Sequence, residues 1–484
     1  MSRMMTLGEA SSLFATETRI KALKRLIADR KTLRVALAGL KGSSAALLLG
    51  KLADRKRPMV IVADDADSAG YLYHDLSRVA ESEVGFFPSG YKRHIKYGRI
   101  DAPQQILRAE TLDGWRHGRL SWVVTYPDAL AERVPVRKEL EDNTLQLSTT
   151  RKADIGKVEE RLEQLGFTHV DYVYEPGQFA RRGSILDVFS YSNELPYRID
   201  FFDDEIDSIR TFNVETQLSE QRLGEVSIIP ASAAEGKGEH GVSLLEFIGK
   251  ETVLFVADTA TLTATVRDIA AQQYSESAAI AEEGDPDAMQ KVVDPEDFAS
   301  RLSEFRIFEF GMAAKGSGAD AVMRFDTSPQ ALYHKNFDII SESFTQMISD
   351  GYRLLILSDS AYQGERLKEI FADRGDRIDF TPVSETIHAG FVDHETRICF
   401  FTDHQIFDRF HKYSLKSDKA RSGKLALSLK ELNQIEVGDY IVHIDHGIGK
   451  FAGLIKTDTN GSPQEMIKHL YQNDEMILVS IHSL

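Results

Sequence analysis

A short aliphatic run, a glycine-rich turn and an apolar helical pattern follow one another near the start of the chain, and this unit constrains the fold most. It reads VALAGLKGSSAALLLGKL, from Val35 to Leu52. The runs Leu33 to Ala38 and Met59 to Ala63 each precede a helical pattern. Buried strands that alternate with helices are typical of a parallel sheet covered by helices. The sequence therefore predicts α/β architecture for residues 1–130.

The glycines of that turn match the spacing of a phosphate-binding P-loop, but the reactive side chains are missing. Such a loop uses a lysine that reaches the phosphates and a hydroxyl that binds magnesium. With Gly39 and Gly42 aligned to the loop glycines, Ala45 replaces the lysine and Ala46 the hydroxyl residue, beside Ser43. We interpret these five residues as a degenerate P-loop that binds no nucleotide. An enzyme with an atypical P-loop is the alternative.

Length and charge limit the classes of protein that this chain can represent. Its 484 residues are too many for one ordinary core, so it is multidomain. The net charge of −17 argues against a surface that binds nucleic acid throughout. One cysteine, Cys399 in the apolar run RICFF, excludes an internal disulfide framework and is predicted to be buried. Neither a membrane helix nor a signal peptide is apparent, which predicts a cytoplasmic protein.

Changes in pattern along the chain suggest several further units. A helix is expected from Asp154 to Leu165, and the chain ends at Leu484 directly after a predicted strand, which suggests a fragment of a longer protein. The predicted division is an α/β domain at 1–130, an inserted α+β module at 131–215, the completion of the first sheet at 216–335, a separate small α/β domain at 336–412, an exposed linker at 413–434, and a small β-barrel-like module at 435–484.

The most distinctive stretch runs from Glu175 to Ser219 and reads EPGQFARRGSILDVFSYSNELPYRIDFFDDEIDSIRTFNVETQLS. Gly183 indicates a tight turn, SILDVF and YRIDFF read as adjacent strands, and DDE as an acidic hairpin turn. Arg182 and Arg198 would then project from neighbouring strands, near Phe202. Arginine beside an exposed aromatic ring is favoured at protein interfaces, so we expect a protein-binding surface here.

This stretch resembles the module shared by the nucleotide-excision-repair protein UvrB and the bacterial transcription-repair coupling factors (the Mfd family). The resemblance implies that the module docks the damage-recognition protein UvrA through Arg182, Arg198 and Phe202. UvrB-like chains tend to carry another arginine two residues before Arg182, where this sequence has Ala180. Whether the adjacent Arg181 substitutes for it is left open by the sequence.

The end of the chain, VGDYIVHIDHGIGKFAGLIK, is similar to the RNA-polymerase-interacting module of coupling factors, a CarD/Tudor-like β domain. That module binds the polymerase β subunit by extending a sheet, a mode in which main-chain hydrogen bonds supply the affinity. The resemblance implies a contact edge at Leu454, Ile455, Lys456 and Thr457. Thr457 stands where some relatives carry an apolar residue.

Taken over the whole chain, the resemblance implies the N-terminal recruitment half of a coupling factor. This half would bind UvrA and RNA polymerase, and it would be neither an enzyme nor a holder of a cofactor. ATP, magnesium and most DNA contacts would belong to a translocase motor elsewhere in the full-length protein. A direct DNA-binding module is a further alternative, because residues 91–99 carry aromatic side chains among basic ones.

Two groups of residues could be imagined as metal sites, but neither is favoured. Strand alternation separates His446 from His443 and Asp445, and no fourth ligand is evident. The carboxylates that follow Phe202 read as a solvated turn; they are Asp203, Asp204, Glu205 and Asp207. The sequence therefore predicts no metal centre.

Overall fold

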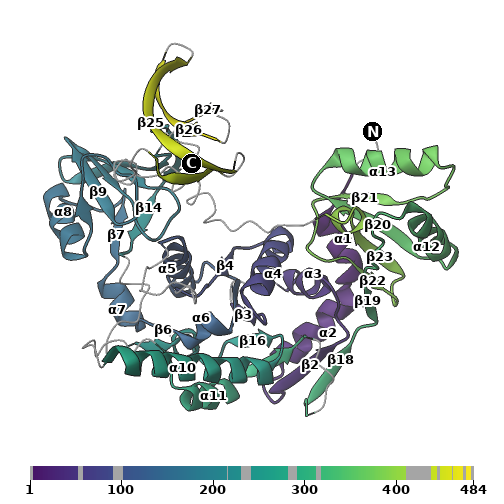
Figure 1. Cartoon of the computed structure of the whole chain (residues 1–484). Helices are drawn as coiled ribbons and strands as arrows, with labels where there is room; N and C mark the ends of the chain where they lie inside the picture. Colours follow the sequence, from purple (N-terminus) through teal and green to yellow (C-terminus); the bar gives the residue numbers. More distant parts are fainter. Residues whose placement is uncertain are drawn as a thin grey trace.

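The computed structural model describes residues 4–52, 58–90, 102–214, 216–230, 241–281, 292–311, 318–409, 438–443, 447–459, 462–471 and 476–480. Figure 1 shows a central α/β domain with an α+β module on one side and a second α/β sheet on the other. Among these residues, no helix combines the length and apolarity needed to cross a membrane. The predicted linker at 413–434 and the basic loop at 91–99 lie outside the described residues.

A seven-stranded parallel sheet forms the centre of the first domain, in the order β18-β2-β17-β16-β3-β5-β4. Strands from before and after the module lie in this one sheet, as the sequence predicted, because β16 pairs with both β3 and β17. The strands are β2 Arg34–Ala38, β3 Met59–Val62, β4 Val84–Phe86, β5 Trp122–Thr125, β16 Val253–Val256, β17 Arg306–Glu309 and β18 Ala321–Arg324.

Helices and one small strand pair complete this domain. The buried strands are almost entirely apolar, as expected for a parallel sheet covered on both faces. The helices are α1 Leu7–Phe14, α2 Glu17–Ala28, α3 Ser44–Gly50, α4 Ala66–Val79, α5 Ala102–Arg116, α6 Pro127–Ala131, α9 Leu244–Ile248, α10 Thr259–Ala281 and α11 Pro295–Ser303. The strand pair is β6 Arg133–Val134 with β15 Val242–Ser243.

The inserted module packs helix α8, Ile155–Gln164, against one face of a six-stranded sheet. Asp154 caps this helix, because its carboxylate accepts a hydrogen bond from the Lys157 N–H at 2.9 Å. The sheet has the order β13-β12-β11-β10-β9-β8. Its strands are β8 Thr168–His169, β9 Gln178–Arg182, β10 Ile185–Val188, β11 Tyr197–Phe202, β12 Glu205–Phe212 and β13 Ser219–Leu223.

The module extends past the predicted boundary at residue 215. Strand β13 pairs with β12, so the sheet continues to Leu223. Beyond it, β14 (Glu225–Ile228) pairs antiparallel with β7 (Leu145–Ser148), which follows helix α7 (Arg137–Asp142). We call the β7–β14 pair the neck, because it joins the two connections between the module and the first domain.

A second six-stranded sheet, in the order β1-β21-β20-β23-β22-β19, corrects the prediction of a separate domain at 336–412. Strand β1 comes from the chain start and pairs parallel with β21, while β19 precedes residue 336. The sheet also shares the apolar core of the first domain, where Phe14 of α1 contacts Phe391 with ring centroids 5.0 Å apart. The elements are β1 Met5–Thr6, β19 Thr327–Pro329, β20 Arg353–Ser358, β21 Thr381–Ser384, β22 Phe391–Asp393, β23 Ile398–Thr402, α12 Phe337–Ser349, α13 Ala361–Asp373 and α14 Asp403–Ile406.

The terminal unit is a four-stranded antiparallel sheet in the linear order β24-β25-β26-β27. Among the described residues, no pairing of β24 with β27 closes this sheet into the predicted barrel. Its strands are β24 Tyr440–His443, β25 Gly447–Thr459, β26 Ser462–Leu470 and β27 Met476–Ser480.

Candidate functional site

The degenerate P-loop is a tight turn that the chain's own backbone approaches closely. Gly39 and Gly42 have φ angles of +94° and +53°, which favour glycine. A Cβ atom at Gly39 would lie 2.0 Å from the Phe325 carbonyl oxygen, and one at Gly42 would lie 2.7 Å from those of Ala389 and Gly390. The two glycines therefore permit contact with protein backbone in this structure.

Residues 386–390, which we call the cradle loop, lie over this turn. The Ser43 N–H donates to the Ala389 carbonyl oxygen at 2.9 Å, and the Ala389 N–H donates to Ser43 Oγ at 2.9 Å. Ala45 and Ala46 are buried in helix α3. The Ser43 amide of the degenerate P-loop thus binds a main-chain carbonyl of the loop between β21 and β22.

A buried carboxylate fixes the other side of the cradle loop. Asp75 of α4 is 2% exposed and accepts a hydrogen bond from the His388 N–H at 2.9 Å, and a further one from the Ser43 hydroxyl. The Tyr71 ring stacks on the His388 ring with centroids 3.4 Å apart. Burial raises the pKa of Asp75 to about 7.

Asp75 should make stability depend on pH in a defined direction. Its folded pKa of about 7 lies above the unfolded value of about 3.9, so the unfolded chain loses this proton first. The Asp75 contribution to the free energy of unfolding should therefore fall between these two pH values, by up to about 4 kcal/mol. Asp75→Asn should remove that fall, measured by urea unfolding at pH 5 and pH 8.

Asp67→Asn, on the exposed side of the same helix, is the matched control. Its free energy of unfolding should change between pH 5 and pH 8 as that of the wild type does. The two tryptophans, Trp115 and Trp122, are buried in the first domain, so their fluorescence reports its unfolding. If the free energy of unfolding changed with pH equally in the wild type and in Asp75→Asn, the pH dependence would not come from Asp75.

In the inserted module, the structure brings Arg182 and Arg198 together through a residue that sequence reasoning missed. The prediction that they lie on neighbouring strands was wrong, because β10 lies between β9 and β11. Asp187 of β10 is 2% exposed and accepts from Arg198 Nε at 2.7 Å and Nη2 at 2.9 Å. The same carboxylate forms an ion pair with Arg182. The signal for this role was an acidic residue inside the apolar strand SILDVF.

Aromatic side chains accompany the two arginines. The Arg198 guanidinium lies 4.1 Å from the ring centroid of Phe212, and that of Arg182 lies 5.4 Å from the centroid of Tyr172. Phe202, at the end of β11, is 78% exposed. Fixed guanidinium groups beside an exposed aromatic ring have the composition of a protein-binding surface.

Arg181 and the acidic turn occupy defined positions in this stretch. Arg181 does not stand in for an arginine at position 180, because it forms an ion pair with Glu159 of α8 on the opposite face. Ala180 itself is 1% exposed. The acidic hairpin turn is confirmed, since Phe202 pairs with Glu205 across Asp203 and Asp204.

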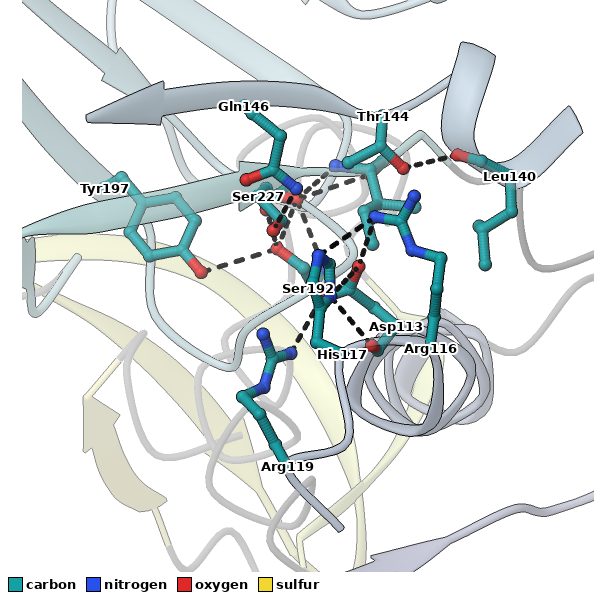
Figure 2. Close-up of polar contacts among 12 residues, drawn as sticks. Asp113, Arg116, His117, Arg119, Leu140, Thr144, Gln146, Ser192, Tyr197 and Ser227 are labelled. Atoms are coloured by element: carbon teal, nitrogen blue, oxygen red, sulfur yellow. Dashed lines mark hydrogen bonds and ion pairs between the residues drawn. The ribbon is translucent and has the colours of Figure 1, made fainter. Parts of the chain in front are cut away.

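A cavity of ≈ 390 Å³ lies where the module meets α5 of the first domain. Figure 2 shows Asp113 beside Arg116, His117 and Arg119. Asp113 is 1% exposed and accepts from Arg116 at 3.0 Å and from Arg119 at 2.7 Å. Because the buried carboxylate is already paired and Gln146 donates to the Ser227 hydroxyl at 2.7 Å, we interpret the cavity as a structural junction.

The predicted polymerase-contact residues occupy one strand of the terminal sheet. Leu454, Ile455, Lys456 and Thr457 lie in β25 and pair with β26, from Leu454 with Ile467 to Thr457 with Gln464. Strand β24 pairs with β25 only from residue 447 to residue 450. In the described register, the outer edge of β25 at residues 454–457 therefore carries no partner strand.

The remaining predictions concern metals and the cysteine. The described part of the structure contains no group of acidic, histidine or cysteine residues that could hold a metal ion. His443 lies in β24, whereas Asp445 and His446 fall outside the described residues. Cys399 is buried in β23, as predicted, and burial raises its pKa to about 12.

Comparison with protein families matches two segments of the chain. Residues 145–233 match the UvrB interaction domain, and residues 435–484 match the CarD-like/TRCF RID domain. The first segment contains α8, the six-stranded sheet and the neck, and so includes Arg182, Asp187, Arg198 and Phe202. The second contains the four-stranded terminal sheet.

Curated relatives extend the match to nearly the whole chain. It is 22% identical to a transcription-repair-coupling factor of Escherichia coli (strain K12), over 93% of the chain and 44% of the relative. The same kind of protein from Staphylococcus aureus (strain Mu50 / ATCC 700699) is 20% identical over 98% and 46%, and that from Haemophilus influenzae is 23% identical over 94% and 45%. The chain thus carries a UvrB interaction domain and a CarD-like/TRCF RID domain, and corresponds over nearly its whole length to a little under half of a transcription-repair coupling factor.

Proposed function

We propose that this chain is the N-terminal recruitment half of a cytoplasmic transcription-repair coupling factor. The module binds UvrA and the terminal sheet binds the β subunit of RNA polymerase, which couples stalled transcription to nucleotide excision repair. The observation that carries this proposal is the cluster in which Asp187 holds Arg182 and Arg198 on the module face that also exposes Phe202. This cluster lies within the segment that matches the UvrB interaction domain.

In this proposal the chain works by binding other proteins and has no catalytic activity of its own. The contacts that Ala389 and Gly390 make at the turn of Ser43 support a scaffolding role for the degenerate P-loop. The chain spans less than half of its coupling-factor relatives, and we attribute ATP hydrolysis, magnesium binding and most DNA contacts to the part that it does not span.

Arg182→Ala and Arg198→Ala should each weaken binding of UvrA, and the double substitution should abolish detectable binding. Each change removes a charged group from the proposed contact. The affinity should therefore fall tenfold or more, since each factor of ten corresponds to about 1.4 kcal/mol of binding free energy. Phe202→Ala should have a comparable effect, because it removes an exposed aromatic anchor. The measurement is surface plasmon resonance of the full chain on immobilised UvrA.

Arg161→Ala, on α8 at the opposite face of the sheet, is the control and should bind like the wild type. Circular dichroism of each variant would exclude unfolding as the cause of a loss. Equal affinity of all variants for UvrA would remove the assigned site.

Proline substitutions in β25 should weaken binding of the polymerase β subunit. Successive residues of a strand direct their N–H groups to opposite edges, so one of Ile455→Pro and Lys456→Pro removes an outward N–H and the other disturbs pairing with β26. Both should lower the affinity by at least about tenfold, whereas Lys456→Ala, which keeps the N–H, should bind nearly normally. Wild-type affinity of both proline variants in a pull-down with the β subunit would contradict edge pairing.

A further inference from the structure

A single cross-strand row runs across five strands of the module sheet. It consists of Ala180 on β9, Asp187 on β10, Arg198 on β11, Arg210 on β12 and Arg222 on β13, each paired with the next. Residues that pair directly in an antiparallel sheet lie on the same face. The row therefore places three consecutive arginines on the face that also carries Arg182 and Phe202.

The charges in this row are not balanced. Asp187 is the only acidic residue among the five, and its carboxylate is shared by Arg198 and Arg182. Like charges directly opposite each other destabilise a sheet. Neither Arg210 nor Arg222 forms an ion pair with a carboxylate in the part of the chain that the structure describes. The row thus leaves the positive charges of Arg210 and Arg222 without a carboxylate partner within the row.

Arg210 holds the more informative position of the two. Its side chain is half-buried, and its Nε atom is buried without a hydrogen-bond partner among the described residues. A buried donor without a partner costs free energy, so an acceptor supplied from outside would be favourable there. Arg222 is exposed at the outer strand of the sheet. The row therefore has a partly buried arginine on β12 and an exposed one on the outer strand.

The surroundings of the row favour a protein partner over a nucleic acid. Exposed apolar side chains lie on the strands and loops nearby, with Leu218 68% and Phe202 78% exposed. Asp187 lies in the row, and Asp200 shares its face, with its carboxylate accepting from the Ser184 hydroxyl at 3.1 Å. Fixed carboxylates beside the arginines disfavour a continuous phosphate backbone, and the chain has a net charge of −17.

We propose that Arg210 and Arg222 extend the Arg182–Arg198–Phe202 surface across β12 and β13, and that this extension binds aspartate or glutamate side chains of a protein partner. Arg210 supplies a central, partly buried contact and Arg222 an exposed contact on the outer strand. The proposal rests on the proposed function, in which that partner is UvrA, and adds the acidic chemistry that the partner must present.

The test measures binding of UvrA to full-chain variants at several salt concentrations. Arg210→Gln and Arg222→Glu should each weaken binding by about tenfold, and should reduce its dependence on salt, because each removes a charge pair. Because Arg222 is exposed, Arg222→Glu should leave the module folded. Lys157→Glu, on α8 at the opposite face, makes the same change of charge as Arg222→Glu and should bind like the wild type.

Normal affinity of Arg210→Gln and Arg222→Glu, in a chain whose Arg182→Ala and Arg198→Ala variants lose UvrA, would overturn the extension and leave the proposed function standing. If the wild type does not bind UvrA, the proposed function fails, and binding of the chain to immobilised poly-L-glutamate then tests whether the row binds carboxylates. Loss of this binding in both Arg210→Gln and Arg222→Glu would support the proposal. Equal binding by the wild type and both variants would overturn it. Preferential retention of single-stranded DNA through these arginines would overturn the assignment to carboxylates.

Discussion

Replacement of Gly42 by alanine is expected to lower the free energy of unfolding of the first α/β domain by about 2–4 kcal/mol. The added Cβ atom would lie 2.7 Å from two main-chain carbonyl oxygens of the cradle loop, at a φ of +53°. Neither backbone can yield without breaking the hydrogen bonds between Ser43 and Ala389. Urea unfolding followed by the fluorescence of the two tryptophans measures the effect.

Gly118→Ala separates the contact from the backbone conformation. Gly118 has a similar φ of +64°, but a Cβ there would meet nothing within 4 Å. This control should therefore lose only about 1–2 kcal/mol, the cost of a left-handed conformation. Equal losses in the two variants would show that the cradle loop does not press on Gly42. Neither variant is expected to bind labelled ATP saturably at millimolar concentration.

Replacement of Asp187 by alanine is the second change with a large expected effect. The Arg198 side chain is only 13% exposed, and the substitution leaves its guanidinium group without its bidentate partner. Breaking a buried pair costs about 3–5 kcal/mol, and partial exposure of Arg182 reduces this to about 2–4 kcal/mol. Amide hydrogen exchange in β10 and β11 should accelerate by about 30-fold or more. Binding of UvrA should weaken as well, because both arginines lose their fixed orientation.

Asp200→Ala is the matched control on the same face of the sheet. Asp200 accepts one hydrogen bond from the Ser184 hydroxyl, so its loss should change exchange in β10 and β11 only slightly. Unchanged exchange in Asp187→Ala would show that the two arginines are held by other contacts.

Local patterns in the sequence were sufficient for much of the fold. The strand, turn and helix around Gly39, the helix that begins after Asp154 and the turn at Asp203 all follow from the spacing of apolar, capping and turn residues. The completion of the first sheet after the module was also predicted. The strand, turn and helix features depend on neighbours in the sequence, which periodicity reports directly, whereas the completion of the sheet was inferred by treating the module as an insertion.

Contacts between distant segments were not predictable in this way. Strand β1 pairs with β21 over a two-residue ladder, and the Ser43 N–H donates to the Ala389 carbonyl oxygen, both of which are main-chain groups that any residue carries. Such pairings leave no periodic signal, so residues 336–412 read as a separate domain. Likewise, family resemblance indicated Arg182 and Arg198, but only the strand order showed that Asp187 lies between them.

The neck has a mechanical consequence for the proposed binding of a protein to the module. Both chain connections to the module run through the antiparallel β7–β14 ladder, and residues of each strand, Leu147, Val226 and Ile228, belong to the module core. Two covalent strands crosslinked by hydrogen bonds resist twisting far better than one flexible tether does. A protein bound to the module, as proposed for UvrA, would therefore be held at a restricted angle to the first domain.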